Sequence, residues 1–324
     1  MTQAKTRAIL YQALFAAAIL LAAWYFLSNV IGNLHARRIA SGFGFLAREA
    51  GFEIGESALV SYSAADTYLK ALLVGLFNTA RVALLAIVFS TLIGLFIGLA
   101  RLSPNWLLAK LAAAYVEVLR NVPLVVQLFF WYAVITESFP APADALHPLP
   151  GLYLSNRGLA FPTLRAEAPF VNFPVLNGFN FAGGATLSPE FTALFFGLAL
   201  YTAAFIGEIV RAGILSVPRG QFEAAQSLGL SQRQTMRSVI LPQALRVVVP
   251  PVTSQYLNCT KNSSLAVAIG YPDLVSIANT TINQTGQAIE GIAIIMLVYL
   301  TISLSIAALM NWYNRHAALR GVSA

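Results

Sequence analysis

One apolar stretch of the sequence contains an unusual density of polar side chains. The stretch extends from Val247 to Tyr271, and residues 253–264 within it read TSQYLNCTKNSS. On a helix that advances about 100° per residue, three of these side chains fall within about 60° of one another and two more extend the same arc. The three are Ser254, Asn258 and Lys261, and the two are Gln255 and Asn262. This chemistry suits hydrogen bonding and charge pairing with a polar solute.

The polar stripe has two physical interpretations. Lipid penalises exposed polar groups strongly, so the stripe must face protein or water. It either lines a pathway for a solute or supplies hydrogen bonds between helices, with Lys261 extending its ammonium toward the nearer membrane surface. The sequence alone leaves both interpretations open.

The other reactive residue types do not form a catalytic set. Glu117 and Glu208 each precede an arginine by three positions, Arg120 and Arg211, and this helical spacing predicts two ion pairs near the ends of membrane spans. The three histidines are far apart in sequence, and the single cysteine, Cys259, excludes an intramolecular disulfide. We therefore expect no catalytic residue, no metal site and no cofactor.

The lysines argue against one kind of nucleotide site. They follow Ala4, Leu69, Ala109 and Thr260, so the sequence contains no Gly-Lys dipeptide. A phosphate-binding loop of the Gly-Lys-Ser/Thr type requires that dipeptide. Hydrolysis of nucleotide by this route is excluded.

The composition places these residues in a membrane protein. The 324 residues are 58% hydrophobic and only 10% charged, whereas soluble domains carry roughly 25% charged residues. The net charge of +7 lies at the ends of apolar runs rather than on one basic face, which argues against a nucleic-acid binder. The expected fold is all-α and polytopic.

Six apolar runs predict membrane spans, since about twenty helical residues cross a hydrocarbon core. The third is expected to begin as an interfacial helix and to break at Pro123. The first could instead be a secretory signal, although it ends in Trp24 and Tyr25, which favour the membrane interface. The runs are Ala8–Leu27, Val82–Ala100, Leu107–Ile135, Phe191–Ile206, Val247–Tyr271 and Ile292–Met310.

The distribution of Lys and Arg predicts the orientation. With a cytoplasmic N-terminus, twelve of the twenty basic residues fall inside and six outside, which places both termini in the cytoplasm. Residues 137–188 then form an extracytoplasmic insert. Seven of the fifteen prolines lie in residues 136–188, so we expect an extended loop there rather than helix.

The longest cytoplasmic loop, residues 213–245, predicts two short helices that meet at a rigid elbow. Glu223, Ala224 and Ala225 belong to the first helix, and Gly229 ends it in left-handed geometry. A capping box of Ser231 with Gln234 begins the second helix, which we expect to stop at Pro242.

This loop resembles the signature of permease subunits of bacterial ABC importers. The shared pattern is Glu223-Ala224-Ala225, three residues, Gly229, nine residues, Val239, one residue, then Leu241-Pro242. The signature usually has isoleucine at the place of Val239, an apolar exchange. Three further stretches resemble the polar amino-acid uptake branch: Tyr115–Leu124 with Gln127, Ala204–Gly213 and Gln255–Ala266. Asn121-Val122 replaces the Gly-Thr that many amino-acid permeases carry.

The resemblance covers residues 69–315, and the additional first span and the insert are most similar to general L-amino-acid permeases. It implies a type I importer transmembrane domain with five core spans, preceded by an N-terminal segment, 1–68, and followed by a cytoplasmic tail, 316–324. The implied partners are an ATP-binding cassette subunit, a second permease of related but different sequence, and a periplasmic amino-acid-binding protein, all at the bacterial inner membrane.

The function implied by this resemblance is ATP-driven import of amino acids, with nucleotide hydrolysed by the partner subunit. The residues that would couple this chain to the ATP-binding cassette subunit are Glu223, Ala224, Ala225, Gly229, Leu241 and Pro242. Import of another small polar solute, or a membrane-embedded receptor or enzyme, stays open as an alternative. Lys261 would bind either the α-carboxylate of the solute or a carboxylate of another span or partner chain. The insert would be either part of the landing surface for the binding protein or a passive cover.

Overall fold

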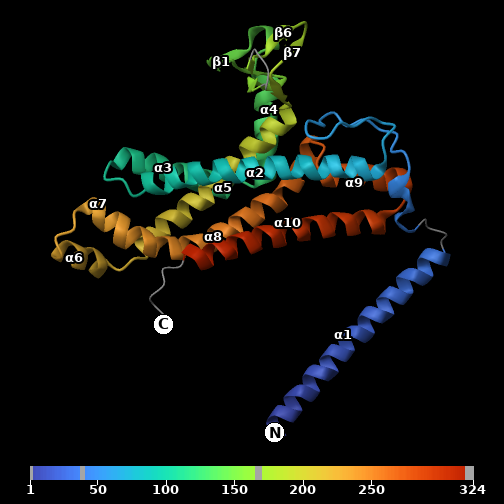
Figure 1. Cartoon of the computed structure of the whole chain (residues 1–324), viewed down its shortest axis with the longest axis horizontal. Coiled ribbons are helices and arrows are strands. Elements are labelled where there is room, and N and C mark those ends of the chain that lie inside the picture. The colour runs from blue at the N-terminus through green and yellow to red at the C-terminus, as the bar shows by residue number, and fades with distance from the viewer. Residues whose placement is uncertain (1–2, 37–40, 165–169, 318–324) are drawn as a thin grey trace.

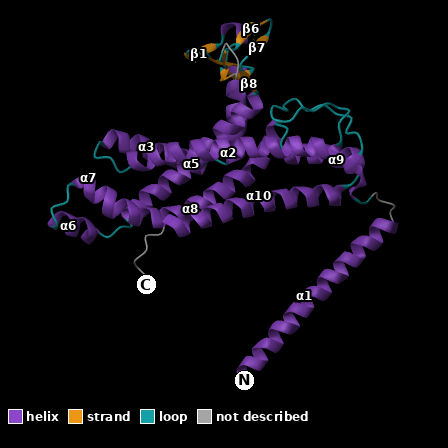
Figure 2. Cartoon of the chain, viewed as in Figure 1, coloured by secondary structure: helices purple, strands orange, loops and turns teal. Residues whose placement is uncertain are grey.

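The computed structural model of the chain describes residues 3–36, 41–164 and 170–317. Helices form most of it, and strands are confined to the insert (Figure 2). The helices are α1 (Gln3–Ala36), α2 (Tyr68–Ala100), α3 (Trp106–Asn121), α4 (Leu124–Ala133), α5 (Pro189–Leu215), α6 (Arg219–Ser227), α7 (Gln232–Thr235), α8 (Leu241–Asn262), α9 (Leu274–Thr285) and α10 (Ala288–Ala317).

The long helices lie where spans were predicted. Four are long and apolar enough to cross a membrane, and up to six spans result if each of two bent helix pairs counts as one. In Figure 1, α2 and α10 run nearly parallel, α4 and α5 lead toward the strands, and α1 stands apart. The second span is longer than expected because α2 begins at Tyr68, where Thr67 accepts a hydrogen bond from the Lys70 amide.

The third span breaks at the predicted proline. The axes of α3 and the segment Leu124–Ser138 differ in direction by 105°, and Pro123 lies between them in an extended conformation. Gln127 bridges the break, because its amide nitrogen donates to the carbonyl oxygens of Leu119 and Val122 at 2.8 and 3.0 Å. Two of the backbone carbonyl groups at the break are thereby satisfied inside the protein.

The fifth span differs from the prediction of one continuous helix over Val247–Tyr271. α8 begins six residues earlier, at Leu241, and changes at Ser263 to a 3₁₀ helix that ends at Ile269. Gly270 then adopts a left-handed conformation, and α9, which the sequence did not predict, follows at an angle of 54°. Asp273 begins α9 by accepting a hydrogen bond from the Ser276 amide.

The core of the helical domain is the close contact between α2 and α5. Gly94 and Gly98 face α5, and a Cβ atom at Gly98 would lie 2.7 Å from the Gly207 carbonyl oxygen and 2.8 Å from Val210 Cβ. Small residues spaced four apart let helix backbones approach in this way, which maximises van der Waals contact where lipid supplies no hydrophobic driving force.

The segment 41–67 packs across the beginning of α2 and against α9. Phe45, Ala50 and Ile54 are buried with Leu72 and Ile277 in one apolar cluster. The Gly42 amide donates to Glu290 of α10 at 2.5 Å. The segment therefore joins α2 to α9 and α10, which lie about 170 residues or more further along the chain.

The insert is a set of small antiparallel sheets rather than the extended loop expected from its prolines. β1, β2, β3 and β8 pair in that order, and two separate hairpins are formed by β4 with β5 and β6 with β7. The strands are β1 (Leu146–Leu149), β2 (Leu152–Ser155), β3 (Gly158–Phe161), β4 (Thr163–Leu164), β5 (Val171–Asn172), β6 (Val175–Asn177), β7 (Asn180–Ala182) and β8 (Ala185–Leu187).

Replacing Gly98 by valine should destabilise the protein, because the new side chain forces α2 and α5 apart. The expected loss is in the range of overpacking substitutions, about 1–3 kcal/mol. Thermal unfolding of the detergent-solubilised protein measures it. Gly32→Val is the matched control, since a Cβ atom on this helical glycine meets nothing within 4 Å. Equal unfolding temperatures for the two variants would contradict the packing argument.

Candidate functional site

The loop between α5 and α8 has the predicted elbow. Gly229 has φ +75°, and α6 ends in a Schellman motif in which the Leu230 amide donates to the Ala225 carbonyl and the Gly229 amide to that of Gln226. The capping box predicted at Ser231 is present, with both hydrogen bonds to Gln234 formed. The turn between α6 and α7 is thus fixed by backbone geometry.

A small apolar core makes this loop a compact body. Val217, Ile240 and Ala244 are buried together, and Phe222 of α6 packs against them. Glu223 and Ala224 are exposed, whereas Ala225 is buried. The loop presents one face of α6 to its surroundings and uses the opposite face to hold itself against the ends of α5 and α8.

Pro242 does not stop the second helix, and this expectation from the sequence was wrong. α7 continues through a π turn, Met236–Ile240, directly into α8. Pro242 lies in the first turn of α8, where the extra residue of the π turn has already altered the hydrogen-bond ladder and the missing amide costs little. Leu241 beside it is exposed. The loop is therefore continuous with the fifth span.

The polar stripe of α8 lies as its periodicity predicted. Ser254, Asn258 and Lys261 are exposed on one side of the helix, and Gln255 and Asn262 are half-buried. The salt bridges of the described residues do not include Lys261. The stripe is thus open to whatever faces this helix outside the chain.

Other polar residues of the same run serve the helix itself. Thr253 and Thr260 donate to the carbonyl oxygens four residues earlier, at 2.9 Å each, and Ser263 and Ser264 donate to those three residues earlier. Such bonds satisfy a hydroxyl inside a membrane helix without an external partner. The structure therefore separates these hydroxyls from the exposed stripe.

One of the two predicted ion pairs is present. Glu208 accepts from Arg211 at 2.6 and 3.1 Å and also pairs with Arg101 at the end of α2. The predicted pair of Glu117 with Arg120 is wrong: among the described residues no salt bridge joins them, and the Arg120 guanidinium instead lies 4.8 Å from the Phe205 ring centroid. Tertiary contact with α5 displaces the local pair.

A second charge network, which the sequence did not reveal, joins the 41–67 segment to the middle of α2 and to the beginning of α5. Glu56 forms a salt bridge with Arg81 at 2.8 Å and accepts from the Ser188 hydroxyl at 2.6 Å. Burial raises the pKa of Glu56, and Ser188 and Arg81 only partly offset that shift. Arg81 was recognisable as a charge flanking a span, but nothing in the spacing indicated a partner 25 residues away.

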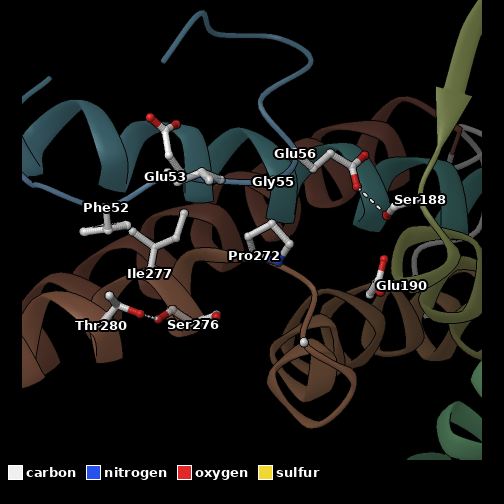
Figure 3. A pocket seen from close by; sticks show the side chains of 12 residues that line it. Phe52, Glu53, Gly55, Glu56, Ser188, Glu190, Pro272, Ser276, Ile277 and Thr280 are labelled. Carbon is white, nitrogen blue, oxygen red and sulfur yellow. Dashed lines mark hydrogen bonds between the residues drawn. The ribbon is translucent and has the colours of Figure 1, made fainter. Parts of the chain in front are cut away.

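Beside this network is an acidic cleft of about 400 Å³, lined by the 41–67 segment, the start of α5 and α9. Figure 3 shows Glu53, Glu56 and Glu190 around it. Glu53 accepts from the Ala64 amide at 3.2 Å and Glu190 from the Tyr132 hydroxyl at 3.2 Å. All three carboxylates thus have roles in the fold.

Metal ligands are not gathered at any of these places. Within the part of the chain that the structure describes, no group of three or more His, Cys, Asp or Glu side chains is arranged to hold a metal ion.

The comparison with known families decides the identity of this architecture. Residues 90–319 match the family described as binding-protein-dependent transport system inner membrane component. The chain belongs to this family. It is therefore a multi-pass inner-membrane component of a transport system, and its helical domain has the fold of a type I ABC importer transmembrane domain.

Two curated relatives match nearly the whole chain. The putative amino-acid ABC transporter permease protein YhdX of Escherichia coli strain K12 is 46% identical, over 97% of this chain and 94% of its own length. The general L-amino acid transport system permease protein AapQ of Rhizobium johnstonii is 42% identical, over 97% and 93%. The additional N-terminal part of the chain is therefore shared with these relatives.

Solved structures confirm the helical fold. An amino acid ABC transporter crystallised with histidines is 28% identical over 77% of this chain and 95% of that chain, with a TM-score of 0.55. The MetNI methionine ABC transporter, 18% identical over 77% and 97%, has a TM-score of 0.53 and supports the fold alone.

Replacing Gly229 by valine should uncouple the loop from transport without removing the protein from the membrane. A Cβ atom there meets nothing within 4 Å, so the only cost is left-handed strain, about 1–2 kcal/mol for a non-glycine residue. Uptake relative to membrane expression measures the effect. Gly220→Val is the control, because Gly220 is equally open and has no positive φ. Normal uptake by the Gly229 variant would contradict the claim that the elbow is needed for transport.

Proposed function

We propose that this chain is a permease subunit of an ATP-driven importer of amino acids. The observation that carries the proposal is the elbow between α6 and α7, with Gly229 in left-handed geometry, in a chain whose family belongs to transport systems. The full-length similarity to YhdX and AapQ supports amino acids as the solute class.

In this proposal Glu223, Ala224, Ala225, Gly229, Leu241 and Pro242 transmit movement from the ATP-binding subunit. The exposed face of α6 meets that subunit, and the apolar core of the loop moves with α6 as one body. Because α7 is continuous with α8 through the π turn, rotation of the loop turns the fifth span directly.

The polar stripe of α8 forms part of the translocation pathway. Ser254, Asn258 and Lys261 leave one side of the helix polar, and Gln255 and Asn262 border it. An exposed ammonium inside a span costs about 2.5–3.5 kcal/mol on insertion scales unless water or an anion compensates it. The α-carboxylate that all amino acids share supplies such an anion, and a carboxylate of the partner permease is the competing one.

The proposed partners supply what this sequence does not: a phosphate-binding loop for ATP and a cover for the exposed polar stripe of α8. An ATP-binding cassette subunit hydrolyses nucleotide, a related but different permease covers the stripe, and a periplasmic protein delivers the solute. Both termini are cytoplasmic, and the insert 137–188 lies outside, far from α6 and α7 in the molecule (Figure 1). The insert forms part of the landing surface for the binding protein.

Residues 69–315 form the transport domain, and residues 1–68 precede it. Most of the tail 316–324 lies outside the described residues.

The test of this function is reconstitution. The purified chain alone should hydrolyse no ATP, and vesicles that contain it with the ATP-binding subunit and the related permease should take up labelled L-amino acids only with ATP and binding protein. Robust hydrolysis by the isolated chain, or vesicles that import a different class of solute, would overturn the proposal.

Replacing Lys261 by methionine should abolish or strongly reduce transport while assembly stays intact, because the change keeps the apolar volume and removes the charge. Uptake rate, apparent affinity and co-purification of the partner subunits are measured together. Lys110→Met is the matched control, since Lys110 is exposed on α3. Wild-type uptake of every amino acid would exclude the pathway role, and failure to assemble would favour a permanent ion pair.

A further inference from the structure

A second cleft, of about 370 Å³, opens where α3 and α5 meet the end of α2. Its volume lies within the range of roughly 300–1,000 Å³ that is usual for small-molecule sites. We call it the α3–α5 cleft. Its lining is Arg101, Val116, Glu117, Arg120, Asn121, Phe205 and Glu208. Four of these seven side chains are charged, which is unusual in a chain with so few charges.

One of the two carboxylates in the cleft is already neutralised. Both oxygens of Glu208 accept from guanidinium groups, one from Arg211 alone and the other from Arg211 and Arg101. A carboxylate held by two arginines has little further capacity to bind a cation. Glu208 therefore holds the two arginines in place at the wall of the cleft and is not available to bind a cationic ligand.

The other two charges remain open. Glu117 and Arg120 are both exposed, and the salt bridges of the described chain include neither of them. They lie one helical turn apart on α3, so one acidic and one basic group border the same cleft.

Phe205 holds Arg120 in a defined orientation. The guanidinium carbon lies 4.8 Å from the ring centroid, a cation–π contact. A guanidinium stacked on an aromatic face keeps its N–H groups directed outward at its edge, where they can bind a carboxylate in a bidentate manner. The contact with Phe205 thus orients the Arg120 guanidinium to bind an anion and keeps it from forming a salt bridge with Glu117.

The membrane restricts what can fill the cleft. Exposed ionised side chains in a membrane domain face water or protein rather than lipid tails. Asn121 adds an amide that can both donate and accept. Besides the pair of Arg101 with Glu208, in which the arginine guanidinium also interacts electrostatically with Glu117, the site offers one anion, one oriented cation and one neutral hydrogen-bonding group.

We propose that the α3–α5 cleft binds the zwitterionic head of an amino acid, with the α-ammonium on Glu117 and the α-carboxylate on Arg120. This inference rests on the proposed function and adds a second solute site to the pathway at α8. Because both contacts involve groups common to all amino acids, the site does not discriminate among side chains, which suits an importer of broad specificity.

The same pair of charges occurs in the phosphoethanolamine headgroup of a phospholipid, which also joins an ammonium to an anion. The two sources differ in a decisive way: the free amino acid exchanges with solution, whereas the headgroup is supplied by the bilayer. The experiment therefore varies both the free amino acid in solution and the phospholipid composition of the bilayer.

The test uses the complete importer complex in nanodiscs without the binding protein. Labelled L-glutamine is the probe, since its side chain is uncharged and only its α groups carry charge. Equilibrium binding is measured against N-acetyl-L-glutamine, which lacks the ammonium, L-glutamine α-amide, which lacks the carboxylate, and phosphoethanolamine. Nanodiscs with and without phosphatidylethanolamine are compared.

The expected result is saturable binding in both lipid mixtures, with neither single-charge analogue competing within tenfold of L-glutamine. Glu117→Gln should weaken L-glutamine binding about tenfold or more and let the N-acetyl analogue compete equally well, since a lost charge-assisted hydrogen bond has an effect of that size. Arg120→Gln should weaken L-glutamine binding to a similar extent and let L-glutamine α-amide compete equally well. Lys110→Gln, exposed on the same helix, is the matched control and should bind as the wild type does.

Three results would overturn the inference. Unchanged affinity and analogue selectivity in both cleft variants would exclude the site, and ATP-driven amino-acid uptake by the wild type would then leave the proposed function standing. Competition by phosphoethanolamine alone, or loss of glutamine binding when phosphatidylethanolamine is present, would assign the cleft to lipid. The absence of both uptake and binding would overturn the function and the site together.

Discussion

The cost of placing charge in a hydrocarbon environment governs the arrangement of this molecule. Each ionised group in the helical domain needs water, an opposite charge or a protein neighbour. The fold meets that requirement at two places along α2: Arg81 in its middle pairs with Glu56 of the 41–67 segment, and Arg101 at its end pairs with Glu208 of α5. These networks join elements that the sequence separates and hold α2 and α5 in the contact that Gly94 and Gly98 permit.

The charges that the fold leaves open are as informative as those it pairs. Lys261, Glu117 and Arg120 remain exposed, on α8 and α3. In a soluble protein such residues would be ordinary surface. In a membrane domain they mark places that face a solute, a partner chain or water, which is why both proposed solute sites rest on them.

The loop between α5 and α8 and the fifth span form one continuous structural unit. Its elbow depends on the left-handed Gly229 and on the Ser231 capping box, both local features. Its connection to the transport domain depends on the π turn at Met236–Ile240, which carries the helix past Pro242 without a stop. In the proposed mechanism, a displacement at the elbow reaches the polar stripe of α8 through the continuous helix from α7 rather than through a flexible linker.

The sequence by itself determined the features that depend on local chemistry and composition. These include the apolar runs, the break at Pro123, the left-handed Gly229, the capping box, and the exposed stripe of Ser254, Asn258 and Lys261, since each follows from backbone preference or helical period. The spacing also predicted the pair of Glu208 with Arg211, whereas only the tertiary structure decided which charges meet across separate elements. Arg120 stacks on Phe205 instead of pairing with Glu117, and Glu56 reaches Arg81, because contacts between distant segments outweigh weak pairing of neighbours on one helix. The strand pairing of the proline-rich insert also came only from the structure, and its β3–β8 pair joins segments about 25 residues apart.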